Sequence, residues 1–513
     1  MAASNLTNFF PETKTIMSTQ SQVPNIEDAQ LRADIDRSLR HPVMFFFTSG
    51  AAWLAVSLVL GIIASAKSHN PGFLGEWSFL QYGRSFPAHI NALIYGWGAQ
   101  AAFGVLIWLM ARLCRQPSKN AGSILVAGHI WNLGVMIGTI GILAGQGTGK
   151  HWMQFPTFVW PVLLAAYAVI AIWSLIAFRC RNNDHTYISQ WYLLGAILWF
   201  PWIYLTANLY VNVFDIHPLM AAAINGWFRH ALIFLFFTPI AIASAYYIAA
   251  KVSGRAIYNY SYSVGGFWAL AIIAPWAGMQ TMMGAPIPVF LQYAGAAATM
   301  LVGVPLIAAG INIIKTASGQ QHTVAHSPSL RFSIAGVVGM LLLAFAGLVL
   351  AHPAALKYTQ FSLAGYGYDI LAIYGFFSMC MFGAIYFIVP RVTRREWLSR
   401  RLIRTHFWFS IYGVLFIFLF CTLLGGFQQG AAQEDHTQPW IQAVKNTLPY
   451  SVGMTVAWCF LLYANFFFLL HLALMWLRLG RRSSHPTLLR REHSALGPHG
   501  PEGDIEELET AQV

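Results

Sequence analysis

Two histidines within apolar segments are the residues of this chain best suited to bind a redox-active metal. His89 lies near the start of an apolar run that ends near Arg112, and His230 lies inside another. Imidazole nitrogen binds both iron and copper, and a ring carried by a rigid helix can be aimed at a metal ion. Each histidine also has a plain structural interpretation, because a buried ring can simply pack and hydrogen-bond, as His89 would beside Asn91.

Arg229, directly before His230, bears on the same choice. An arginine within a bilayer costs roughly 2.5–3.5 kcal/mol on insertion scales, so its side chain is expected to face protein, water or an anion. Its positive charge also disfavours a cation at the neighbouring imidazole. The pair therefore favours a polar interior site and weakens the case for a metal ion at His230.

The composition predicts the elements that must position these residues. Of 513 residues, 57% are hydrophobic, 15% are aromatic and only 9% are charged, which is too little polar surface for a soluble globule. A bilayer core requires about 20 apolar residues per helical span. We expect an all-α integral membrane protein with about twelve spans, near 43–66, 88–111, 122–143, 156–178, 189–209, 218–250, 263–283, 288–314, 332–351, 370–389, 407–425 and 452–477.

The basic residues predict the orientation. Lys and Arg accumulate on the cytoplasmic side of membrane proteins. With both termini placed in the cytoplasm, all but six of the 30 basic residues fall on that side; the six are Lys67, Arg84, Lys150, Arg229, Lys357 and Lys445. The net charge of +12 then reflects topology and contact with anionic membrane lipid, and it does not indicate nucleic-acid binding.

The chain is expected to form one membrane domain with flexible ends. Polar and turn-forming residues dominate at both termini, so we predict a cytoplasmic tail over 1–41, a twelve-helix membrane domain over 42–479 and a second cytoplasmic tail over 480–513. The five cysteines include no Cys-x-x-Cys pair, which gives no indication of a disulfide framework or of c-type heme attachment.

Three windows, in this order, carry a family resemblance. They are Tyr82 to Ala92 with Pro87-Ala88-His89-Ile90-Asn91, Trp227 to Pro288 with Pro275-Trp276-Ala277-Gly278, and Gly367 to Arg391 with Gly367-Tyr368-Asp369. Together they resemble subunit I of the heme-copper oxidases, in particular the cbb3-type cytochrome c oxidases, over roughly 40–482. The resemblance implies a subunit I-like bundle in the cell inner membrane, electron transport in aerobic respiration, heme and copper cofactors, and partner subunits such as c-type cytochromes.

The heme ligands of the family are mostly absent from this sequence. The resemblance places His89 at one axial ligand of the low-spin heme and Ile370 at the other, although isoleucine cannot bind iron. It places Tyr368 at the ligand of the high-spin heme, and a tyrosinate can bind iron there. A local insertion before this position makes Tyr366 an alternative in that role. Arg84 is a candidate contact for a heme propionate.

The copper site is depleted in the same way. The resemblance places His230 at the first copper ligand, but the adjacent pair of histidines is replaced by Gln280 and Thr281. The family's redox-active tyrosine position is occupied by Ala274, so no catalytic residue is assigned. Amide and hydroxyl oxygens are weak ligands for copper, and copper is therefore not expected. Arg229 stands where the family has a small residue, which suggests that a side chain fills the site.

Three functions follow from this pattern. The leading hypothesis is a divergent, non-catalytic cbb3-type subunit I-like protein, a pseudoenzyme in a respiratory electron-transport complex, with at most one heme b at His89. The second is an active cytochrome c oxidase or nitric oxide reductase subunit with atypical heme ligation, so enzyme activity remains open. The third is a channel or transporter that reuses the interior past Arg229, His230, Gln280 and Thr281.

Overall fold

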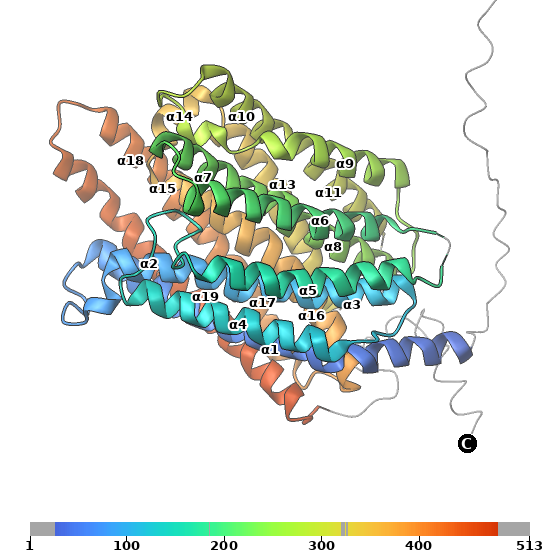
Figure 1. The fold of residues 1–513 in the computed structure, drawn as a ribbon. Helices are drawn as coiled ribbons and strands as arrows, with labels where there is room; N and C mark the ends of the chain where they lie inside the picture. The colour runs from blue at the N-terminus through green and yellow to red at the C-terminus, as the bar shows by residue number, and fades with distance from the viewer. Residues whose placement is uncertain (1–25, 184, 320–323, 325–326, 481–513) are drawn as a thin grey trace, which may run out of the picture.

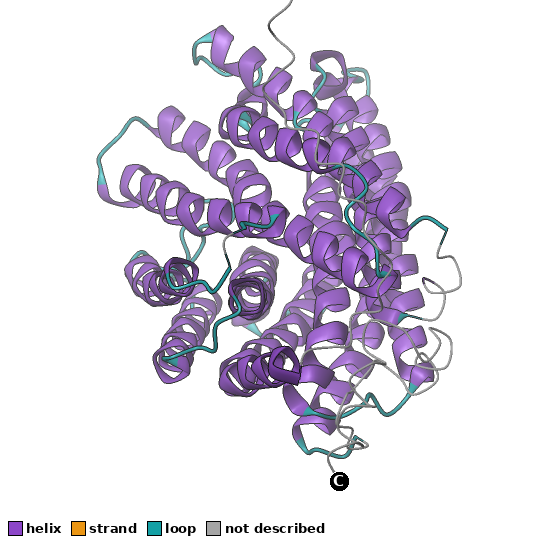
Figure 2. Cartoon of the chain, turned by 90° about the vertical axis from the view of Figure 1, so that its right-hand side faces the viewer, coloured by secondary structure: helices purple, strands orange, loops and turns teal. Residues whose placement is uncertain are grey.

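The computed structural model describes residues 26–480, apart from 184, 320–323 and 325–326. The regular elements in this described part are all helical (Figure 2), and twelve helices or helix pairs are long and apolar enough to cross a membrane. The predicted all-α fold with about twelve spans is confirmed. The first helix, α1 (Ile26–His69), begins well before the predicted start of the membrane domain at 42. That predicted boundary concerns the membrane and stays a prediction, as do the two tails, which lie largely outside the described residues.

The remaining spans follow in chain order. They are α2 (Tyr82–Asn91) with α3 (Ala99–Cys114), α4 (Ala121–Leu143), α5 (Val159–Arg179), α6 (Ile188–Asn208), α7 (Pro218–Leu232) with α8 (Thr238–Ser253), α9 (Tyr260–Ile273), α10 (Val289–Leu301) with α11 (Gly303–Ala317), α13 (Pro328–Leu350), α15 (Leu363–Ile370) with α16 (Met379–Thr393), α17 (Arg400–Leu415) with α18 (Gly425–Glu434), and α19 (Trp440–Trp476). A short helix, α14 (Pro353–Thr359), lies between α13 and α15.

Three spans form the centre of the bundle. The most apolar windows of α2–α3, α7–α8 and α15–α16 are completely buried, whereas those of the other nine spans in the described residues are between 33% and 56% buried. The outer spans therefore expose apolar side chains, such as Ile272 of α9 and Phe345 of α13, in the way that lipid-facing helices do. The three enclosed spans are the ones that carry His89, His230 and Tyr368.

Each enclosed span changes its helical pitch directly after the candidate residue. A π-helical segment joins α2 to α3 (Ala92–Gly98), another joins α7 to α8 (Ile233–Phe237), and a third joins α15 to α16 (Leu371–Ser378). Such segments are rare and occur frequently at functional sites. The site-bearing helices α2, α7 and α15 lie toward the same end of the bundle, together with α14 (Figure 1).

Candidate functional site

His89 is fully buried and is held from both sides of its ring. Its Nδ1 lies 2.7 Å from the carbonyl oxygen of Ser57 on α1, which can only accept, so Nδ1 carries the proton and donates to it. Its Nε2 lies 3.1 Å from the hydroxyl of Tyr366, which therefore donates to the Nε2 lone pair. Gly61 allows this close approach, because a Cβ there would lie 2.8 Å from the imidazole.

The surroundings of His89 bear directly on the candidate low-spin heme. A backbone carbonyl on Nδ1 is the usual support of a metal-binding histidine, but iron would need the Nε2 lone pair that Tyr366 occupies. The Tyr366 ring packs between Phe86 and Trp458, with centroid distances of 5.4 and 6.5 Å. Ile370 is buried and offers no ligand. In this arrangement His89 is a hydrogen-bonded core residue, and heme at His89 would require Tyr366 to move.

Arg84, the candidate propionate contact, is already engaged with protein. Its Nη1 donates to the carbonyl of Leu143 at 3.1 Å, at the end of α4. A carbonyl in the last turn of a helix has no partner within the helix, so the guanidinium satisfies it. The observed role is to join α2 to α4, and the role in heme binding stays a prediction.

His230 is held in the same manner as His89. Its Nδ1 donates to the Gly226 carbonyl at 3.2 Å, and its Nε2 lies 3.1 Å from Nε2 of Gln280. The Gln280 amide oxygen accepts from the backbone N–H of Gly278 at 2.9 Å, so its NH₂ group must face His230 and donate to it. The residue at a copper-ligand position thus supplies a hydrogen-bond donor to the lone pair that copper would need.

The other residues of the copper position do not restore a site. The hydroxyl of Thr281 donates to the Gly278 carbonyl at 2.7 Å, and Ala274 is buried in the turn before it. Gly278 adopts φ +107°, and a Cβ there would lie 2.8 Å from the Gly226 carbonyl oxygen. The turn therefore packs directly onto α7.

Tyr368 lies against His230, with ring centroids 6.1 Å apart and ring planes inclined by 28°. A porphyrin between two rings needs about 3.5 Å to each neighbour, which amounts to about 7 Å between the flanking rings. The observed spacing leaves no room for a porphyrin stacked between the Tyr368 and His230 rings. Among the described residues, moreover, no three His, Cys, Asp or Glu side chains form a group able to hold a metal ion.

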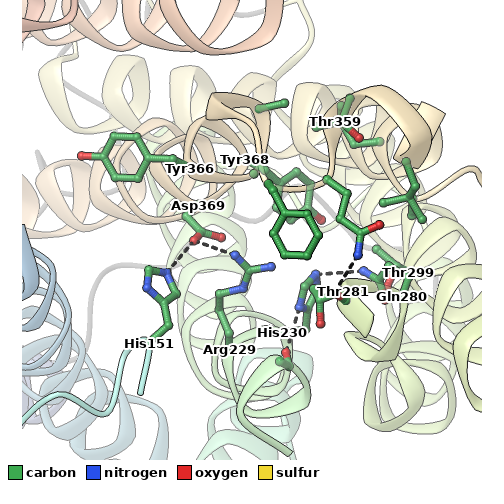
Figure 3. A pocket seen from close by; sticks show the side chains of 18 of the residues that line it. His151, Arg229, His230, Gln280, Thr281, Thr299, Thr359, Tyr366, Tyr368 and Asp369 are labelled. Atoms are coloured by element: carbon green, nitrogen blue, oxygen red, sulfur yellow. Dashed lines mark hydrogen bonds and ion pairs between the residues drawn. The ribbon is translucent and has the colours of Figure 1, made fainter. Parts of the chain in front are cut away.

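A buried ion pair occupies the neighbouring space (Figure 3). Nη1 of Arg229 lies 3.1 Å from Oδ2 of Asp369, and Nε2 of His151 lies 3.5 Å from the same oxygen. Asp369 is 2% exposed and Arg229 16%. The contacts join α7, α15 and the loop between α4 and α5, and they satisfy the expectation that Arg229 faces protein.

The sequence alone did not predict this pairing. A signal for it exists, because an arginine within a span requires compensation and Asp369 is one of the few acidic residues near a span.

The loop that carries His151 is fixed on both sides. Lys150 donates to the Val211 carbonyl and to Oδ1 of Asn212, and burial lowers the pKa of its amino group. Asn225 of α7 donates to the His151 carbonyl at 2.8 Å.

A cavity of about 570 Å³ lies beside these residues. Its polar lining includes Arg229, His230, Thr281, Tyr368 and Asp369, so the structure brings most of the predicted site residues to one hollow. His89 is held nearby through Tyr366, which also lines the cavity. Arg229 fills only part of the site, since this volume remains.

The three completely buried spans, α2–α3, α7–α8 and α15–α16, and the positions of His89 and His230 on two of them are those of an oxidase subunit I class of membrane protein. Residues 41–460 match the family model described as cytochrome C and quinol oxidase polypeptide I, and the chain belongs to this family. It is a cbb3-like member of the heme-copper oxidase subunit I proteins and a multi-pass protein of the inner membrane.

Its similarity to individual relatives is distant but extensive. It is 25% identical to the cbb3-type cytochrome c oxidase subunit CcoN1 of Stutzerimonas stutzeri, over 74% of this chain and 81% of that protein. It is 24% identical to a cytochrome c oxidase subunit 1 homolog of Agrobacterium tumefaciens (strain T37), over 80% and 76%. A cryo-EM structure of a heme-copper terminal oxidase dimer shares the fold, with a TM-score of 0.66, 15% identity, and 87% and 86% of the two chains covered.

Proposed function

We propose that this chain is a non-catalytic membrane subunit of a respiratory electron-transport complex, built on the subunit I scaffold without its oxygen-reducing centre. The observation that carries this proposal is the hydrogen bond that the Gln280 amide donates to Nε2 of His230. The ring of Tyr368 stacks on the same histidine, with ring centroids 6.1 Å apart. Copper would lose its nitrogen ligand to a hydrogen-bond donor, and with these side-chain positions no porphyrin fits between the Tyr368 and His230 rings. The described arrangement does not fit the family's cofactors.

The charge distribution supports the same proposal. A metal site needs electron-pair donors and little positive charge around the ion. Here the guanidinium of Arg229 lies beside His230 and pairs with the buried carboxylate of Asp369. Both histidines use Nδ1 for a backbone carbonyl and Nε2 for a neutral donor. Their protons and lone pairs are thus fully used within the protein, in contacts between elements except for the bond from His230 to Gly226, which lies within α7.

Partners follow from the scaffold. We propose that the chain assembles with other respiratory oxidase subunits, of which c-type cytochrome subunits are the first candidates, and that both termini face the cytoplasm. The domain boundaries at 42 and 479 belong to the same proposal.

The test is a dithionite-reduced minus oxidised visible spectrum of the purified chain, with iron and copper measured on the same sample. Absence of both metals, or one heme without copper, supports the proposal. The second result would favour heme b at His89, with Tyr366 displaced. Two hemes with copper would overturn it and establish an active oxidase with atypical ligation.

A second function, a channel or transporter, is favoured by one observation, the polar groups of Arg229 and His230 in the wall of the cavity. Its test is solute or proton flux in vesicles that show no cytochrome spectrum. Flux above that of protein-free vesicles would favour transport, and equal flux would remove this candidate.

A further inference from the structure

The cavity beside the ion pair has the size and lining of a small-molecule site. Its volume of about 570 Å³ lies within the range of about 300–1,000 Å³ that is typical of ligand pockets. One part of the wall is apolar and includes Phe86, Met282, Leu350 and Leu356. The rest is polar, and this mixture suits a compact ligand with a hydrophobic body and a polar group that needs a fixed partner.

The polar wall offers hydrogen-bond donors that the protein does not use. Arg229 gives one N–H to Asp369, and the remaining guanidinium N–H groups find no acceptor among the described residues. The same holds for the hydroxyl protons of Tyr368 and Thr299 within the described part of the chain, although the Thr299 oxygen accepts from the Gly278 N–H at 3.3 Å. All three side chains line the cavity. A ligand that fits this wall must therefore bring acceptors.

The charge of the site selects an uncharged acceptor. Arg229 and Asp369 together have no net charge, and His230 is held neutral because its Nε2 accepts from Gln280. An anion would approach the Asp369 carboxylate and compete with it for the guanidinium, in surroundings where desolvation is costly. A carbonyl oxygen accepts the same hydrogen bonds without this repulsion.

A short surface element covers the cavity on one side. Thr359 of α14 and the turn after it, Gln360 to Ser362, contribute to the lining, and Gln360 donates to the Met283 carbonyl at 3.0 Å. Phe361 has φ +60° and is 87% exposed, a strained conformation for a bulky residue of the kind found at ligand clamps. The cavity therefore borders a turn at the surface as well as packed spans.

We propose that this cavity binds a small uncharged carbonyl compound, with the carbonyl oxygen accepting hydrogen bonds from Arg229 and the Tyr368 hydroxyl. The proposal rests on the proposed function in one respect, that no high-spin heme occupies the space beside Tyr368. Heme at His89 would displace Tyr366, which also lines the cavity, so the visible spectrum is recorded on the sample used for binding.

The experiment uses benzamide and benzoate, which have nearly the same shape and differ in charge. The full chain is placed in nanodiscs, and isotope-labelled benzamide is measured by equilibrium dialysis, with empty nanodiscs as the blank. Tyr368→Phe removes one donor and keeps the ring. Tyr374→Phe is the matched control, because it removes another buried tyrosine hydroxyl, six residues further along the same span and outside the cavity.

We expect one saturable benzamide site per chain, which benzoate occupies at least tenfold more weakly. Tyr368→Phe should weaken benzamide binding about fivefold, the usual effect of one hydrogen bond, and Tyr374→Phe should leave it unchanged. Absence of saturable binding, preference for benzoate, or equal effects of the two substitutions would each overturn the proposal. The visible spectrum of the same sample tests the proposed function separately, so failure of one is distinguishable from failure of the other.

Discussion

Removing one member of the Arg229–Asp369 pair should destabilise the domain far more than removing both. At 3.1 Å and an effective dielectric constant of about 20, two unit charges attract each other by about 5 kcal/mol. Because Asp369 is 2% exposed, Arg229→Met leaves a largely desolvated carboxylate with only His151 beside it, and we expect a loss of about 3–5 kcal/mol in the free energy of unfolding. Asp369→Leu should cost a similar amount.

The double variant Arg229→Met/Asp369→Leu separates this account from simple packing. Two apolar side chains in place of a buried ion pair are often neutral in stability, so the double variant should recover most of either single loss. The assay is equilibrium unfolding in mixed micelles, with the coupling energy taken from the double-mutant cycle. The surface pair Lys357–Glu434 is the control, and Lys357→Met should change stability far less. Additive losses in the double variant would refute the reasoning.

Three further predictions concern the capped histidines and the turn beside them. Tyr366→Phe leaves the His89 lone pair without a donor and should lower the free energy of unfolding by about 1–3 kcal/mol; no change would show that the Tyr366 hydroxyl does not hold His89. Gln280→Met should cost about 2 kcal/mol in the same unfolding assay and leave the metal content unchanged, and a gain of bound copper would contradict the site described here. Gly278→Ala should prevent stable folding, judged by recovery of monodisperse protein, because its Cβ would meet a carbonyl at 2.8 Å. Gly284→Ala, also at positive φ but with open space around the Cβ, should cost only about 1 kcal/mol; equal recovery of the two variants would rule out the steric argument.

The fold was predictable because it depends on a property that each segment carries by itself. A span needs only length and apolar composition, so twelve spans followed from the sequence. For a related reason it was predictable that Arg229 would face a polar or charged group, since an arginine within a span demands a partner. The sequence did not identify that partner, because Arg229 and Asp369 are 140 residues apart and meet only when α7 packs on α15.

The hydrogen bonds that Tyr366 and Gln280 donate to the two histidines could not be predicted from the sequence, for a more specific reason. His89 and Tyr366 are 277 residues apart, and the register of Tyr366 depends on an insertion whose path cannot be inferred from composition. Whether Gln280 donates to His230 or merely lies near it is decided by the backbone N–H of Gly278, which fixes the orientation of the amide. The cavity follows from side-chain volumes that no local pattern encodes.

The π-helical segments divide each central helix into two independently set parts. One extra residue turns everything beyond it by about 100° relative to an uninterrupted α-helix. The end that carries His89, His230 or Tyr368 therefore has its own rotational register, separate from the buried half that follows it. Substitutions in the part of each helix that carries His89, His230 or Tyr368 can therefore be accepted without repacking the part beyond the π-helical segment. These segments are natural junctions at which α2, α7 or α15 could be exchanged with the corresponding helix of a relative.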